Sequence, residues 1–361
     1  MRIIILLFLI CNYSNCNILA NTFADNTQTA TRFQDNFQKI IKTPARPIKA
    51  NLQNKNVTIA FATPLKQNSD YWRRSIQSFE ARMKELKINY KLYEFSTAIY
   101  EKRKAHIAIQ KAMLLQPDYL VTTISSKSDE ITISNLLAAK NTKVIIQNLV
   151  EPLEKWRNTP PFMYVGFSHR KGTKMLADKY KKIFAKKEKI NFGILYFLRN
   201  SPINRQRGLY FTNLFKKSKF TLTNAFYTKA DFQTAKTATA KILKKQHSLD
   251  FIYACSTDIA LGAISAIKDS DISNPPIVNG WGGGSDELKS IAKKDMAFTV
   301  MRLNDDNGVA MAEAIKLNIE AQKLPKPIIY SGSMKIIDQN TTKAELKKIK
   351  EYAFRYSNAK R

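Results

Sequence analysis

The sequence predicts an α/β protein with two lobes, each built on a mostly parallel sheet flanked by helices. Apolar runs typical of buried strands alternate with amphipathic segments typical of helices, which indicates βαβ units. The 361 residues are too many for one ordinary hydrophobic core. The alternation breaks over residues 151–162, where Pro152, Pro160 and Pro161 disfavour regular structure. Two halves of this kind are expected to close on a ligand held at the carboxyl ends of their strands.

The first 24 residues are predicted to be a secretory signal peptide. Arg2 supplies one positive charge, and the apolar run over residues 3–10 is too short to span a bilayer. Cleavage after Ala20 or Ala24 fits the small residues there. We therefore expect the mature protein to be exported to the periplasm.

Residues 25–52 are polar, and Pro44 breaks any helix in them, so we interpret this segment as an N-terminal arm. We assign the first lobe to residues 53–167 and 303–325. Helices are expected to end near Leu86, Leu115 and Ala139, and the strands are predicted over residues 57–62, 88–95, 119–124, 143–148 and 163–167.

The second lobe is assigned to residues 168–302 and 326–361. A helix from Asp305 or Asp306 to about Gln322 belongs to the first lobe, and a closing helix is expected over residues 342–355. The strands of the second lobe are predicted over residues 191–197, 221–227, 251–255, 276–279, 297–301 and 328–337.

Composition limits the possible partners and the chemistry. Lys and Arg number 59 against 29 Asp and Glu, so the net charge is +30. Nucleic-acid binding or adhesion would fit this charge, but the lysines are spread through helix after helix, which favours solvated helix faces. Cys11 and Cys16 lie in the signal peptide, so Cys255 is left without a disulfide partner.

No enzyme or cofactor motif is present in the sequence. His106, His169 and His247 are the only histidines, and they lack metal-site or triad spacing. The glycines of residues 280–284 do not form the dinucleotide fingerprint and are better explained by a close approach of the backbone to a ligand or a lobe. We therefore predict a protein that is not an enzyme and that needs no cofactor.

Three strands of the second half end in residues suited to a small ligand. Thr257 follows the run over residues 251–255, Trp281 follows residues 276–279, and Arg302 follows residues 297–301. Since the carboxyl ends of parallel strands share one edge of a sheet, we expect these side chains to form one wall of a binding site.

The stretches over residues 69–72, 251–258, 279–285 and 300–306 resemble LuxP-like autoinducer-2-binding proteins of the sugar-binding (type I) periplasmic binding protein family. The resemblance extends from residue 46 to about residue 357. It implies a furanosyl borate diester as ligand, with boron present only in the ligand, and a membrane sensor histidine kinase of the LuxQ type as partner. The implied ligand-binding residues are Gln67, Ser69, Trp72, Thr123 and Asn148 in the first lobe and Arg207, Thr257, Trp281 and Arg302 in the second.

The chemistry of these residue types fits such a ligand. Arg207 and Arg302 would hold the borate anion, because guanidinium groups bind anions with several fixed donors. The short polar side chains would bind hydroxyl groups, while Trp72 and Trp281 would pack against the ring. Each residue taken alone also has a structural explanation. A sugar-binding protein of an ABC transporter remains the alternative, with Asp258 as the acid that could accept sugar hydroxyls.

Overall fold

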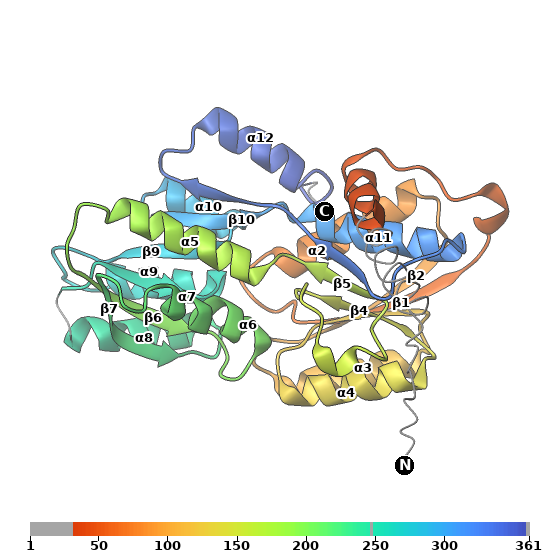
Figure 1. The fold of residues 1–361 in the computed structure, drawn as a ribbon, viewed down its shortest axis with the longest axis horizontal. Coiled ribbons are helices and arrows are strands. Elements are labelled where there is room, and N and C mark those ends of the chain that lie inside the picture. Colours follow the sequence, from red (N-terminus) through yellow and green to blue (C-terminus); the bar gives the residue numbers. More distant parts are fainter. Residues whose placement is uncertain (1–31, 246–247, 359–361) are drawn as a thin grey trace, which may run out of the picture.

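The computed structural model describes residues 32–245 and 248–358. It has the predicted two-lobed α/β fold, with each sheet lying between layers of helices (Figure 1). The predicted signal peptide lies outside the described residues. None of the helices within the described ranges is long and apolar enough to cross a membrane.

The first lobe is built on a six-stranded parallel sheet in the order β11-β5-β4-β3-β1-β2. Its strands are β1 (Val57–Thr63), β2 (Tyr90–Ser96), β3 (Tyr119–Thr122), β4 (Lys143–Gln147), β5 (Met163–Gly166) and β11 (Ile328–Ser331). Its helices include α2 (Tyr71–Glu85), α3 (Lys102–Leu114), α4 (Lys127–Ala139) and α11 (Asp305–Ile319), with short 3-10 turns at Ala50–Leu52 and Glu154–Trp156.

The second lobe repeats this arrangement in the order β12-β10-β9-β8-β6-β7, with only β12 antiparallel to its neighbour. The strands are β6 (Ile190–Tyr196), β7 (Phe220–Tyr227), β8 (Phe251–Ala254), β9 (Ile277–Gly282), β10 (Phe298–Arg302) and β12 (Met334–Asp338). The helices are α5 (His169–Ile183), α6 (Pro202–Asn204), α7 (Tyr210–Leu214), α8 (Phe232–Lys245), α9 (Thr257–Lys268), α10 (Ser285–Ala292) and α12 (Lys343–Ala353).

The segment predicted as one strand of the second lobe over residues 328–337 is two strands in different lobes. β11 pairs with β5 in the first sheet, whereas β12 pairs with β10 in the second. Gly332 lies at the crossing, where its N–H donates to Gly166 O at 2.8 Å. A Cβ at Gly332 would lie 2.4 Å from the Phe167 ring, so this crossing requires glycine. The assignment of residues 326–361 to the second lobe is therefore wrong for β11.

The predicted N-terminal arm also differs from the structure. Residues 32–42 form a helix that ends just before Pro44, and its Phe37 and Ile41 are buried in the core of the first lobe. A polar segment can still form a helix that packs by one face if a few apolar residues recur at helical spacing, as Phe37 and Ile41 do here. The interpretation of this segment as an arm without a helix is therefore wrong for residues 32–42.

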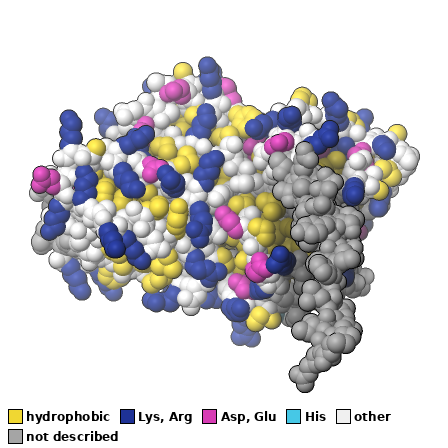
Figure 2. Space-filling view, viewed as in Figure 1, with side chains coloured by type: hydrophobic (Ala, Val, Ile, Leu, Met, Phe, Trp, Pro, Cys, Tyr) yellow, Lys and Arg dark blue, Asp and Glu magenta, His cyan; other side chains and the backbone are white. Residues whose placement is uncertain are grey.

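The surface charge is distributed as predicted. On the face shown in Figure 2, Lys and Arg side chains are scattered over both lobes and do not gather in one stripe. Many pair with single acids one helical turn away, such as Lys174 with Asp178 and Lys289 with Asp286. This pattern is typical of solvated helix faces.

Candidate functional site

A small cavity lies between the two lobes and is lined by residues of both. Eight of the nine predicted residues line it: Gln67, Ser69, Trp72, Asn148, Arg207, Thr257, Trp281 and Arg302. Thr123 does not. It lines a neighbouring cavity of the first lobe, and Ile99 lines both cavities and forms the boundary between them.

Two buried guanidinium groups dominate the cavity. Arg207 and Arg302 are only 4% and 5% exposed. The Arg207 guanidinium lies 3.6 Å from the centroid of the Trp281 ring, and the Arg302 guanidinium lies 4.0 Å from that of the Tyr71 ring and 5.9 Å from that of Trp281. The aromatic faces therefore hold both cations in place and partly offset their charge.

Neither guanidinium has a carboxylate within 4.0 Å among the residues that the structure describes. Burial and the nearby charge of Arg302 lower the pKa of Arg207 to about 9, and burial lowers the pKa of Arg302. The Arg302 Nε–H has no hydrogen-bond acceptor within the described ranges. Unpaired buried cations are costly, so the cavity is electrostatically suited to an anion.

Arg207 is positioned by an unusual turn. It lies in a π-helical segment, Arg205–Leu209, between α6 and α7. Its Nη1 donates to Cys255 O at 3.0 Å, at the end of β8. A Cβ at Gly208 would lie 2.4 Å from Tyr196 Cδ1, so glycine allows the turn to pack closely on β6. π-helical turns of this kind are frequent at functional sites.

Trp281 and Arg302 are positioned by contacts from the end of β9 and from α10. The buried Glu287 carboxylate accepts hydrogen bonds from Trp281 N–H at 2.9 Å and Gly283 N–H at 2.7 Å. Gly282 has a φ of +142°, and a Cβ there would lie 2.5 Å from Arg302 Nη2. The close approach predicted from the glycines is therefore an approach to Arg302 at Gly282 and to Asp70 of the first lobe at Gly284, where a Cβ would lie 2.5 Å from Asp70 Oδ1.

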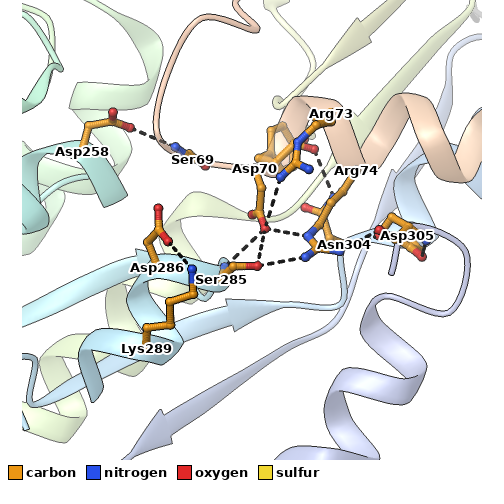
Figure 3. Close-up of polar contacts among 12 residues, drawn as sticks. Ser69, Asp70, Arg73, Arg74, Asp258, Ser285, Asp286, Lys289, Asn304 and Asp305 are labelled. Atoms are coloured by element: carbon orange, nitrogen blue, oxygen red, sulfur yellow. Dashed lines mark hydrogen bonds and ion pairs between the residues drawn. The ribbon is translucent and has the colours of Figure 1, made fainter. Parts of the chain in front are cut away.

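Two carboxylates, Asp258 and Asp70, each accept hydrogen bonds from the opposite lobe and so connect the two lobes (Figure 3). The Asp258 carboxylate of the second lobe accepts from Asn68 N–H at 2.9 Å and Ser69 N–H at 3.4 Å in the first. Asp70 of the first lobe accepts from Ser285 Oγ at 3.0 Å in the second. Asp258, considered from the sequence as an acceptor for sugar hydroxyls, is engaged by the protein's own backbone.

Seven further residues line the cavity, and of these only Asp258 was considered from the sequence: Tyr71, Ile99, Phe197, Ile203, Ala230, Ser256 and Asp258. Phe197 directly follows β6, so the strand-end argument used for Thr257 would have found it. Tyr71 lies inside the stretch 69–72 that carries the family resemblance. Ile203 and Ala230 belong to loops and short helices, which give no periodic signal.

The profile described as "Periplasmic binding protein domain" matches residues 59–323, and the chain belongs to that family. Its members are ligand-binding proteins that catalyse no reaction, and membership indicates a periplasmic location. The prediction that the chain is not an enzyme is thereby confirmed.

Solved structures with the same fold include three similar proteins. An ABC transporter periplasmic solute-binding protein from Actinobacillus succinogenes with bound D-allose is 16% identical, with a TM-score of 0.67 over 81% of this chain and 99% of that one. A carbohydrate transporter solute-binding protein from Agrobacterium radiobacter in complex with D-arabinose is 14% identical, with a TM-score of 0.70 over 82% and 99%. A chain of the XylFII-LytSN complex is 17% identical, with a TM-score of 0.65 over 79% and 98%.

Proposed function

We propose that this protein is a periplasmic receptor that binds autoinducer-2 as a furanosyl borate diester and relays the signal to a membrane sensor histidine kinase. The observation that carries the proposal is the pair of buried arginines, Arg207 and Arg302, that have no carboxylate partner among the described residues. A tetrahedral borate would supply the missing negative charge.

The rest of the cavity suits the sugar-like part of this ligand. Gln67, Ser69 and Asn148 offer amide and hydroxyl groups from the first lobe, and the Asn148 Oδ1 has no partner within the described ranges. Trp72 and Trp281 line the cavity as apolar walls, and one face of the Trp281 ring is covered by the Arg207 guanidinium. A small, polyhydroxylated anion therefore fits the residues of both lobes.

The second candidate is a sugar-binding protein of an ABC transporter. Its support comes from the similar structures with bound D-allose and D-arabinose. A neutral sugar would leave two buried guanidinium groups with no carboxylate within 4.0 Å among the described residues, although Glu287 and Asp70 act on Arg302 from farther away. The acid best placed to bind hydroxyls, Asp258, already accepts two backbone N–H groups. These costs favour the anion.

The proposed kinase partner rests on the resemblance of the sequence to autoinducer-2 receptors. The XylFII-LytSN complex is a precedent for such a partner, because a chain of this fold is found there in complex with a different protein. The partner kinase would distinguish lobe positions, since ligand binding changes the population of the closed form.

A thermal-shift experiment tests the proposal. The purified protein is heated with the autoinducer precursor with and without borate, and with D-allose and D-arabinose, in borate-free plasticware. We expect the largest rise in Tm with precursor and borate together, because only the bound anion stabilises the folded state. An equal rise with and without borate overturns the borate proposal, and a rise with a neutral sugar alone favours transport.

A further inference from the structure

His169 is a buried histidine that none of the ligand-binding assignments uses. It begins α5, directly after the chain crosses from the first lobe into the second, and it is 0% exposed. Its ring lies against Trp281, with 5.3 Å between the centroids in an edge-to-face arrangement. It therefore lies behind the cavity wall, on the side of Trp281 and Arg207.

Both ring nitrogens of His169 contact groups whose hydrogen-bonding roles are fixed. Nδ1 lies 3.2 Å from Arg207 Nε, which can only donate, and Nε2 lies 2.8 Å from the backbone carbonyl oxygen of Asn148, which can only accept. Nδ1 must therefore be unprotonated and Nε2 must carry the proton. This neutral tautomer is the only form of the ring that satisfies both partners.

A second proton on His169 would break this arrangement. An imidazolium would lose the acceptor for Arg207 Nε–H and would add a third positive charge next to two buried guanidinium groups. The groups facing the ring are Arg207, Arg302, the Trp281 ring and the Asn148 carbonyl. Burial and the two arginines hold the pKa of His169 well below its usual value, which keeps the ring neutral.

We propose that His169 is a positioning residue that orients Arg207 toward the bound anion and joins it to Asn148 in the other lobe. Arg207 Nε is held by His169 and Nη1 by Cys255 O, which leaves Nη2 with no hydrogen bond to the described residues and able to donate to a ligand. The ligand-dependent part of this inference rests on the proposed function, because it takes Arg207 as a ligand-binding residue.

Two variants separate orientation from packing. His169→Phe keeps a ring against Trp281 but removes both polar contacts, and His169→Asn restores an acceptor close to the position of Nδ1. With precursor and borate in titration calorimetry, we expect His169→Phe to weaken binding on the order of ten- to a hundredfold, since it leaves Arg207 Nε unpaired. His169→Asn should recover at least about threefold of the lost affinity. His106→Asn removes a histidine that does not line the cavity and should bind like the unmodified protein.

A double-mutant cycle tests whether His169 acts through Arg207. In an Arg207→Ala background, adding His169→Phe should cost less than about twofold, because the contact it removes is already gone. Full additivity of the two losses overturns the proposal, and so does equal binding by His169→Phe and the unmodified protein.

A measurement without ligand tests the arrangement of His169 between Arg207 and Asn148 even if the variants do not fold. In the unmodified protein labelled with ¹⁵N-histidine, NMR should show the His169 ring neutral at pH 6, with the proton on Nε2. A proton on Nδ1, or an imidazolium at that pH, overturns the inference. If the unmodified protein fails to bind the precursor with borate while this tautomer is observed, only the proposed ligand is wrong. The inference that His169 positions Arg207 then stands.

Discussion

The carboxylate of Asp258 accepts a hydrogen bond of 2.9 Å from the backbone N–H of Asn68, which lies 190 positions earlier in the chain and in the other lobe. Ser69 N–H donates to the same carboxylate at 3.4 Å. The contacts use protein atoms alone, so the closed conformation has a stabilising interaction that needs no ligand. The free-energy difference between the open and closed forms is therefore smaller, and a ligand needs less binding free energy to make the closed form predominate.

We expect Asp258→Asn to favour the open form. An asparagine keeps one oxygen acceptor but places an NH₂ group beside the second backbone donor. Binding of precursor with borate should weaken on the order of five- to tenfold, and small-angle X-ray scattering of the ligand-free protein should show a larger radius of gyration. Asp286→Asn, an exposed acid of the same lobe that pairs with Lys289, is the control. An unchanged radius and affinity would show that the contact between Asp258 and Asn68 contributes nothing to closure.

We expect Arg302→Ala to weaken binding of precursor with borate on the order of a hundredfold, because it removes a buried charge from the wall of the proposed anion site. Lys182→Ala removes the same formal charge from an exposed face of α5 and should change the affinity by less than about twofold. Titration calorimetry measures both. Equal losses would mean that overall charge, and not a specific anion site, determines binding.

Gly282→Ala should disturb the same arginine without changing any charge. The added Cβ would lie 2.5 Å from Arg302 Nη2, and the φ of +142° disfavours any residue with a side chain. We expect an affinity loss of about tenfold or more, since a small displacement of a buried donor removes its contact with the anion. Gly193→Ala is the matched control, because its added Cβ would have no neighbour closer than 3.6 Å. A Gly282→Ala protein with full affinity would contradict the described position of Arg302.

Asp305 should make the stability of the protein depend on pH. Burial raises its pKa from 3.8 to about 6, although it accepts hydrogen bonds from the N–H groups of Tyr356 and Ser357. Between these pH values the folded state keeps a proton that the unfolded state has released, so stability falls as pH rises from about 4 to 6 and is constant above.

Asp305→Asn removes this dependence. The unmodified protein loses stability over this pH range and the variant does not. The free energy of unfolding of Asp305→Asn minus that of the unmodified protein should therefore rise by about 2 to 3 kcal/mol between pH 4 and pH 7. Urea unfolding at pH 4, 5, 6 and 7 measures the difference. Asp271→Asn changes an exposed acid and should show no such trend. A relative stability that falls toward pH 7 would contradict the buried environment of Asp305.

Much of the site could be predicted because its residues lie at strand ends. Trp281 and Arg302 lie at the ends of β9 and β10, and Thr257 comes shortly after β8, so the parallel strands bring all three to one edge of the sheet. Thr123 also follows a strand, β3, yet it lines the neighbouring cavity. Strand order places a residue at the right edge, but the packing of loops such as the one carrying Ile99 decides which cavity it lines.

The role of His169 could not be read from the sequence for a related reason. A single histidine at the start of a helix has no motif, and the sequence shows neither Arg207 Nε nor the Asn148 carbonyl beside it. These partners lie 38 and 21 residues away, and only the packed lobes bring them within hydrogen-bond distance.

By itself the sequence determined the α/β alternation, the two-lobed class and most of the residues that share the cavity. The fold class and the strand-end residues Thr257, Trp281 and Arg302 depend on apolar periodicity and on the direction of strands, which are properties of short stretches of chain. The other cavity residues were expected only from the resemblance to a known family. The tertiary structure alone decided that β11 and β12 belong to different lobes, that Asp258 accepts from Asn68 N–H, and that Arg207 and Arg302 have no carboxylate within 4.0 Å in the described chain. Each of these depends on contacts between residues far apart in sequence, whose positions are fixed only when both lobes have packed.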